Sequence, residues 1–132
     1  MDLEKVCVNL LAAELGKIDV LVAQGLYSSR TDLIRSGIRQ VIDDNSEAVE
    51  RVATGSTGIG YILMTRTELL GAKRSGKKLH YFVVGVLRIE KSITPDLAEE
   101  AIERVQIFGS VKGPQPVIDR LGDKIVRGFG IT

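Results

Sequence analysis

A short stretch near the N-terminus alternates apolar and polar residues, and two helical patterns follow it directly. In residues 5–10 every second side chain is apolar, which is typical of a strand with one buried face. In residues 11–22 apolar side chains recur every three or four positions, as on one face of a helix. Gly25 is suited to end that helix, and Ser29 is suited to cap a second one, whose apolar face lies within residues 33–42. The predicted order is strand, helix, tight turn, helix.

The predicted strand has no second strand to pair with in the first 44 residues. Because the backbone N–H and C=O groups of a strand need partners, we expect the same strand of a second copy to pair with it, antiparallel across a two-fold axis. The apolar side chains of both strands would then cover the helices. The side chains predicted for this dimer core are Val6, Val8, Leu10, Leu33, Ile34 and Ile38. The side chains predicted to point outward are Lys5, Cys7 and Asn9.

These 44 residues resemble the ribbon-helix-helix family of DNA-binding regulators, the Arc-, MetJ- and CopG-type repressors. The resemblance rests on the alternating strand, on the turn Gly25-Leu26-Tyr27, and on Ser29-Arg30-Thr31-Asp32-Leu33-Ile34-Arg35 with Ile38 downstream. It implies an intermolecular two-stranded β-ribbon that enters the major groove of DNA, with Lys5, Cys7 and Asn9 as base-reading residues. It also implies that the start of the second helix binds a DNA phosphate. The candidate phosphate-binding residues are Ser29, Arg30 and Thr31.

Bulk charge does not support DNA binding, because the net charge of the 132-residue chain is only +1. Residues 1–44 hold five basic and seven acidic side chains, whereas residues 53–132 hold twelve basic and eight acidic ones. DNA contact must therefore depend on local basic surfaces. The densest basic cluster could touch flanking DNA backbone, although such clusters usually face solvent only. It consists of Lys73, Arg74, Lys77 and Lys78.

The pattern changes after a helical connector that is predicted over residues 47–53. Thr54 to Gly58 is rich in glycine, serine and threonine, and residues 55–60 are expected to be a linker because they match no phosphate-binding or dinucleotide motif. We therefore expect two domains. Residues 1–52 would form the DNA-binding and dimerisation domain, and residues 53–132 would form a small α/β domain for assembly or sensing. The predicted fold class is α+β.

The second domain reads as strands alternating with helices. Strands are predicted at Ile59–Thr65, Leu79–Glu90, Val105–Lys112 and Lys124–Ile131. Helices are predicted after the cap Thr94-Pro95 and at Pro116–Leu121, and a basic loop is predicted at Gly71–Lys78. Gly85 and Gly109 occupy matching places in two similar strands with a helix between them, which indicates parallel strands or two coils of a short solenoid. The Leu79–Glu90 strand is apolar on both sides, so we expect both faces to be covered.

The sequence gives no indication of catalysis or of a bound cofactor. No nucleophile–base pair or carboxylate dyad stands out, so we expect no enzyme. His80 is the only histidine and Cys7 the only cysteine, and one of each in different segments does not make a metal site. A single cysteine and the lack of a long apolar run favour a cytoplasmic protein without a membrane span.

These features together predict a sequence-specific DNA-binding transcriptional regulator, most simply a repressor. It would bind double-stranded DNA as a homodimer or a tetramer, with an effector that the sequence does not identify. One alternative is an antitoxin, although the strands and capped helices of residues 79–131 differ from the disordered tail typical of that class. The other alternative is a scaffold protein in which residues 53–132 polymerise.

Overall fold

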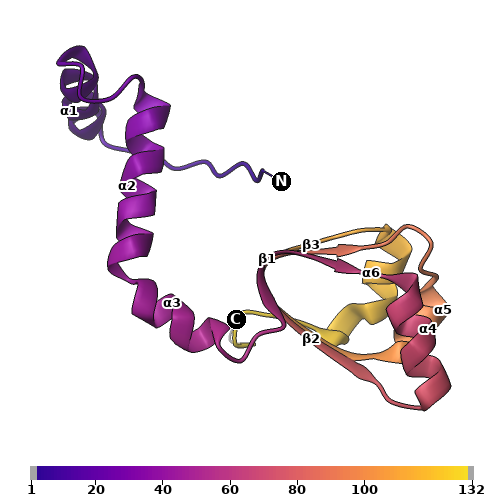
Figure 1. Ribbon diagram of the computed structural model, residues 1–132. Helices are drawn as coiled ribbons and strands as arrows, with labels where there is room; N and C mark the ends of the chain where they lie inside the picture. Colours follow the sequence, from indigo (N-terminus) through magenta and orange to yellow (C-terminus); the bar gives the residue numbers. More distant parts are fainter. Residues whose placement is uncertain (1–2, 131–132) are drawn as a thin grey trace. The chain divides into compact units, whose positions relative to one another are not determined.

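The computed structural model describes residues 3–130 of the chain. The described residues divide into two compact units, residues 3–50 and residues 51–130. Within residues 3–130 there are six α-helices, one short 3-10 helix and four strands (Figure 1). The first two helices lie within the N-terminal unit. All four strands lie in the C-terminal unit.

The N-terminal unit consists of an extended segment followed by helices. Helix α1 spans Ala12–Ala23 and helix α2 spans Arg30–Asp44, and helix α3, Ser46–Ala53, follows α2 after a single residue. Helix α2 begins where a serine N-cap predicts it, because the Ser29 hydroxyl accepts a hydrogen bond of 3.0 Å from the backbone N–H of Asp32. None of the three helices contains a buried residue.

The predicted N-terminal strand is absent, so the expectation of an N-terminal two-stranded ribbon was wrong. Residues 3–11 carry no regular secondary structure, and every strand of the described chain comes after the first three helices. The physical reason is that a strand is held by hydrogen bonds to a neighbouring strand, and the N-terminal unit contains none. Alternation of apolar and polar residues indicates which side chains can share a face, but it supplies no backbone partner.

The C-terminal unit is a parallel sheet with its helices on one face. Its elements in chain order are β1 (Gly58–Met64), α4 (Arg66–Ser75), β2 (Leu79–Ile89), α5 (Pro95–Ala101), β3 (Ile102–Lys112), α6 (Gln115–Leu121), the 3-10 helix η1 (Gly122–Lys124) and β4 (Ile125–Arg127). The strand order in the sheet is β1-β2-β3-β4, and every neighbouring pair is parallel, as predicted for β2 and β3. Helices α4, α5 and α6 pack side by side (Figure 1).

The hydrophobic core of the described chain lies between this sheet and its helices. Alternate residues of the central strand β2, such as Val83, Leu87 and Ile89, are fully buried against Leu69 of α4 and against α5 and α6. The residues between them, including Phe82 and Val84, are only half-buried. The helices therefore cover one face of the sheet, and the expectation that both faces are covered is not met within this unit.

Three glycines stand next to one another across the sheet. Gly60 of β1 pairs with Gly85 of β2, and Gly85 pairs with Gly109 of β3. Gly85 and Gly109 have φ angles of +134° and +130°, a conformation that L side chains rarely adopt. A Cβ at Gly109 would lie 1.9 Å from the Gly85 carbonyl oxygen. The backbones therefore approach so closely that only glycine fits, which explains the matching glycines in the sequence.

Three further predictions for the C-terminal unit needed correction. Residues 58–60 belong to β1 and not to a linker, and residues 71–75 of the predicted loop at residues 71–78 belong to helix α4. The sequence contains the start signal of α4, because Thr65 accepts a hydrogen bond from the backbone N–H of Glu68, three residues on. The predicted last strand is shorter, since β4 ends at Arg127 and residue 131 lies outside the described residues.

Candidate nucleic-acid interface

The candidate base-reading residues lie in the extended segment before α1. Lys5, Cys7 and Asn9 are all exposed. The apolar residues between them are exposed too, with Val6 at 79% and Val8 at 72%. Within a single chain both sides of the segment therefore face solvent, and burial does not distinguish its polar side from its apolar side.

The remaining residues predicted for a dimer core are also incompletely buried. Ile34 and Ile38 on α2 are 40% and 54% exposed, Leu33 is half-buried, and Leu10 is 38% exposed. Exposed apolar side chains in such numbers commonly mark a surface that another molecule covers. The N-terminal unit as a single copy thus has apolar faces but no core.

The candidate phosphate-binding residues are brought together at the start of α2. Ser29, Arg30 and Thr31 are exposed and consecutive there. The first N–H groups of an α-helix have no partner within the helix, and the positive end of the helix dipole lies at the same place. The start of α2 therefore has the chemistry of an anion site, with the Asp32 N–H already occupied by Ser29.

The side chain of Arg30 makes a contact that the sequence had not suggested. Its Nε donates to Asp19 Oδ1 at 2.7 Å and its Nη2 donates to Asp19 Oδ2 at 2.8 Å, which is a two-point ion pair between α2 and α1. Both side chains are about half exposed. The hydrogen bonds from Arg30 lower the pKa of the Asp19 carboxyl below its ordinary value. Two carboxylates therefore lie beside the proposed phosphate site, that of Asp19 and that of Asp32, which accepts a hydrogen bond of 3.0 Å from the backbone N–H of Ser28.

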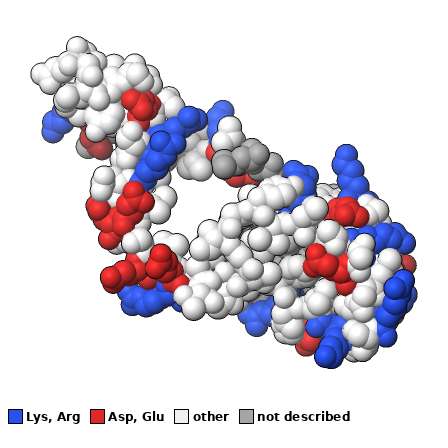
Figure 2. Space-filling model, in the orientation of Figure 1, with Lys and Arg blue, Asp and Glu red and all other residues white. Residues whose placement is uncertain are grey.

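The basic cluster of the C-terminal unit surrounds the end of α4. Lys73 and Arg74 lie in the last turn of that helix, and Lys77 and Lys78 lie in the short connection to β2. All four are exposed, and Lys73 forms an ion pair of 3.3 Å with Glu100 of α5. Figure 2 shows blue and red side chains interspersed over the helical side of this unit, so the cluster is a local feature and not part of a large positive face.

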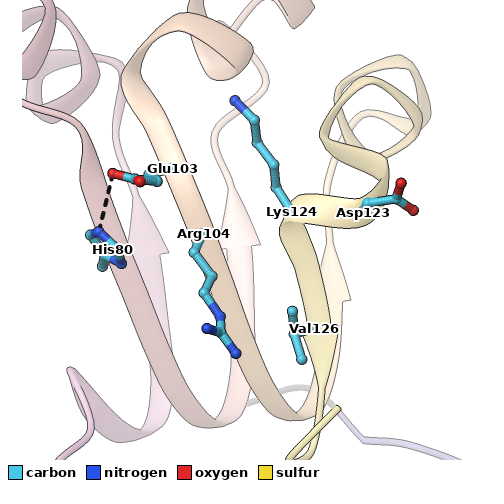
Figure 3. A pocket seen from close by; sticks show the side chains of 6 residues that line it. All are labelled: His80, Glu103, Arg104, Asp123, Lys124 and Val126. Carbon is cyan, nitrogen blue, oxygen red and sulfur yellow. Dashed lines mark ion pairs between the residues drawn. The ribbon is translucent and has the colours of Figure 1, made fainter.

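The amino ends of strands β2, β3 and β4 form an open hollow of about 560 Å³. Its lining residues are His80, Glu103, Arg104, Asp123, Lys124 and Val126. In Figure 3 His80 and Glu103 point toward each other, and their ion pair measures 3.3 Å, whereas Asp123 points away from the other side chains. Lys124 donates to the carbonyl oxygens of Glu99 and Ile102 at 2.7 and 2.9 Å, so it caps the end of α5. The hollow is open and most of its lining side chains are charged, unlike a typical ligand pocket.

Among residues 3–130, no three His, Cys, Asp or Glu side chains are grouped in a way that could hold a metal ion. No helix within the same residues has the length and apolar character needed to cross a membrane.

The sequence profile of the ribbon-helix-helix transcriptional regulator family matches residues 1–117, which include the extended segment, both helices of the N-terminal unit and most of the parallel sheet. Comparison with curated proteins gives no match, and comparison with solved structures gives none either. The family match covers most of the chain and agrees with the resemblance of the first 44 residues. The chain belongs to the ribbon-helix-helix transcriptional regulator family.

Proposed function

We propose that this regulator is a sequence-specific DNA-binding repressor that acts as a homodimer, or as a tetramer of two dimers. Residues 1–52 dimerise and bind double-stranded DNA. Residues 53–132 assemble copies or sense an effector. Lys5, Cys7 and Asn9 read base edges in the major groove, and Ser29, Arg30 and Thr31 hold a phosphate.

The observation that carries the proposal is the apolar exposure of the N-terminal unit. Val6 and Val8 are 79% and 72% exposed, and α1, α2 and α3 contain no buried residue. Burying one large apolar side chain stabilises a protein by about 1.5–3 kcal/mol. With these side chains in water, the N-terminal unit gains little of that stabilisation. A second copy that covers Val6, Val8 and Leu10 supplies the missing core.

The polar residues of the same segment suit base reading. When the apolar side is covered by a second copy, Lys5, Cys7 and Asn9 remain in water on the other side. The Asn9 amide can form a bidentate pair with adenine N6 and N7, and the Lys5 ammonium can donate to guanine O6 and N7. Cys7 is short and lets the backbone approach the groove closely. Two copies give two half-sites, so the DNA target is expected to be a palindrome.

Phosphate binding is assigned to the start of α2 for two reasons. The backbone N–H groups of Arg30 and Thr31 lie in the first turn, where the helix dipole favours an anion. The guanidinium of Arg30 adds a positive charge, which Asp19 partly neutralises. The backbone N–H groups therefore make the main contact with the phosphate. The ion pair with Asp19 reduces the positive charge that Arg30 offers to that phosphate.

The basic cluster at the end of α4 is proposed to touch DNA backbone that flanks the site. Lys77 and Lys78 are exposed and follow the last turn of α4, which carries Lys73 and Arg74. Contacts of this kind add affinity and salt dependence without base preference.

Selection of bound duplexes from a random pool by the full-length chain tests the proposal. We expect an enriched palindrome whose half-sites are spaced by about 10 base pairs or a multiple of that number. The Asn9→Ala variant is the matched control, and it should enrich a motif with relaxed preference at one position of each half-site. Enrichment of no motif by the folded wild-type chain would contradict sequence-specific binding. Sedimentation of the same sample should give a discrete dimer or tetramer, whereas open-ended assembly would favour the scaffold alternative.

A further inference from the structure

The face of the sheet opposite the helices carries a compact group of apolar side chains. We name it the sheet patch, and it consists of Ile59, Tyr61, Phe82, Val84, Val86 and Phe108. The strand register places Ile59, Val84 and Phe108 in one row and Tyr61 and Val86 in the next. Ile59 and Tyr61 are 61% and 50% exposed, and the rings of Phe82 and Phe108 lie 6.0 Å apart. In Figure 2 the strand side of the C-terminal unit is largely uncharged, while charged side chains gather over its helical side.

Within residues 51–130 the ring of Phe129 packs edge-on against Phe108, with 4.9 Å between the ring centroids, and so covers part of this face. A largely uncovered apolar face is unusual for a parallel sheet. Strands of parallel sheets are normally buried on both faces, because the crossover helices or another layer cover each side. Here α4, α5 and α6 all pack against the face that carries Val83 and Leu87. Since the opposite face also carries several large apolar side chains, its composition suits a second covering layer.

We propose that the sheet patch packs against the sheet patch of a second copy within the regulator's dimer. Three strands about 4.8 Å apart, over a length of about 20 Å, give the patch roughly 300 Å² of projected area. A stable complex of separate proteins buries about 1,200–2,000 Å² in total, so the patch is too small to hold an unattached partner. Two C-terminal units that are tethered to one N-terminal dimer face each other at an effective concentration in the mM range, where a contact of this size is sufficient.

The charges beside the patch favour an antiparallel arrangement of the two sheets. Arg88 and Lys112 lie in adjacent strands at the carboxyl end of the sheet, where their positions pair in the register. If the two copies packed with their strands running the same way, four basic side chains would meet at one end. A two-fold axis that runs across the strands places the two basic pairs at opposite ends and brings Val84 of one copy near Val86 of the other.

The inference rests on the proposed dimer, and crosslinking of the full-length chain without DNA tests it separately from DNA binding. In a Cys7→Ser background the substitution Val84→Cys introduces a single thiol at the centre of the patch. A bismaleimide that spans about 10 Å, the spacing of packed sheets, should link two copies. The matched control is Asp119→Cys, an exposed position on α6 in the helical layer, which should not be linked. Adding Tyr61→Glu to the Val84→Cys chain should lower the yield about tenfold, because it places a charge in the contact.

Three results would overturn the inference. The first is equal crosslinking at positions 84 and 119 in a sample that sediments as a dimer, which would leave the dimer intact and remove only this contact. The second is an unchanged yield after Tyr61→Glu. The third is a thiol at position 84 that resists labelling but forms no crosslink, since a different occupant would then cover the patch. Crosslinking at position 84 together with a wild-type chain that binds no DNA would instead contradict the proposed function alone.

Discussion

Arg30 and Asp19 are joined by two hydrogen bonds of 2.7 and 2.8 Å that tie the first turn of α2 to α1. The same arginine stands at the start of α2, where we propose that a DNA phosphate binds. Asp19 therefore competes with the phosphate for the guanidinium. Its negative charge also lies beside the proposed site, so we expect the pair to restrain non-specific binding in addition to linking the helices.

Removing this carboxylate should strengthen binding to DNA of any sequence. In Asp19→Asn the guanidinium of Arg30 is released, so the salt slope of binding should increase by about 0.9 for each phosphate that it then contacts, or about two per dimer. A salt titration on cognate and scrambled duplexes measures this. The control is Asp43→Asn, an exposed acidic residue near the end of α2, which should leave the slope unchanged. A weaker affinity of Asp19→Asn for both duplexes would show that the pair positions Arg30 for DNA.

The ion pair between Arg30 and Asp19 should also make the stability of the N-terminal helices depend on pH in the acid range. The pKa of Asp19 is lowered in the folded chain, so its ion pair contributes stability that is fully present above the ordinary carboxyl pKa of 3.8. That contribution is lost as the pH falls through the lower value of the folded state. Helicity measured by circular dichroism should therefore depend less on pH below about 4 in Asp19→Asn than in wild type. If helicity fell with pH in the same way in wild type and in Asp19→Asn, the ion pair would not contribute to the stability of the helices.

The dimer can be tested at Val8, which is 72% exposed in a single copy. If a second copy covers this side chain, Val8→Asp places a charge in the contact twice, once from each copy, at a cost of several kcal/mol per dimer. Sedimentation at micromolar concentration should then show a monomer. Asn9→Asp adds the same charge one residue further on, at a position that we expect to remain in water, and it should stay dimeric. A dimeric Val8→Asp chain would exclude Val8 from the dimer core.

Two Gly→Ala substitutions in the C-terminal unit, one in the row of glycines and one in α4, should change the stability of the unit in opposite directions. A Cβ at Gly109 would lie 1.9 Å from a carbonyl oxygen, and φ is +130° there, so Gly109→Ala should destabilise the C-terminal unit by several kcal/mol. Gly71 lies within α4 with no atom near its missing Cβ, so Gly71→Ala should stabilise the unit by up to about 1 kcal/mol. Chemical denaturation measures both. Similar stabilities for the two variants would contradict the close approach of β2 and β3.

The basic cluster at the end of α4 should contribute to the salt dependence of DNA affinity. If Lys77 and Lys78 each contact a phosphate, the double substitution Lys77→Gln and Lys78→Gln should reduce the salt slope by about 0.9 per contact, with base preference unchanged. Lys91 is exposed in the turn after β2, and Lys91→Gln is the control. An unchanged salt slope of DNA binding in the double variant would show that Lys77 and Lys78 face solvent and do not contact DNA.

Local signals predicted the α-helices other than α4 and the strands of the C-terminal unit, whereas several features that depend on long-range packing were not predicted. Ser29 and the Thr94-Pro95 cap predicted the starts of α2 and α5 because capping depends on residues that are close in sequence. The glycines at 85 and 109 predicted parallel neighbours, which the register confirms. Helix α4 was missed although Thr65 and Glu68 form its capping pair, because the basic residues at its end read as a loop.

Two features of the candidate site depend on partners that a sequence pattern does not contain. The alternation of residues 5–10 predicted a strand, yet a strand requires a neighbour, and the ribbon expectation was wrong for that reason. Arg30 and Asp19 are eleven residues apart on different helices, and only the packing of α1 on α2 brings them together. The roles assigned to Lys5, Cys7 and Asn9 stay predictions until binding is measured.

The most direct test compares a residue that we propose reads a base, Asn9, with a residue that we propose holds a phosphate, Arg30. Affinity is measured over a range of salt concentrations, on cognate and scrambled duplexes, for Asn9→Ala and Arg30→Ala. We predict that Asn9→Ala costs about 1–3 kcal/mol on the cognate duplex and little on the scrambled one. Arg30→Ala should weaken binding to both duplexes alike, because it removes a positive charge beside the proposed phosphate site and touches no base. A change of base preference in Arg30→Ala, together with equal losses on both duplexes in Asn9→Ala, would contradict the assignment of base reading to the N-terminal segment.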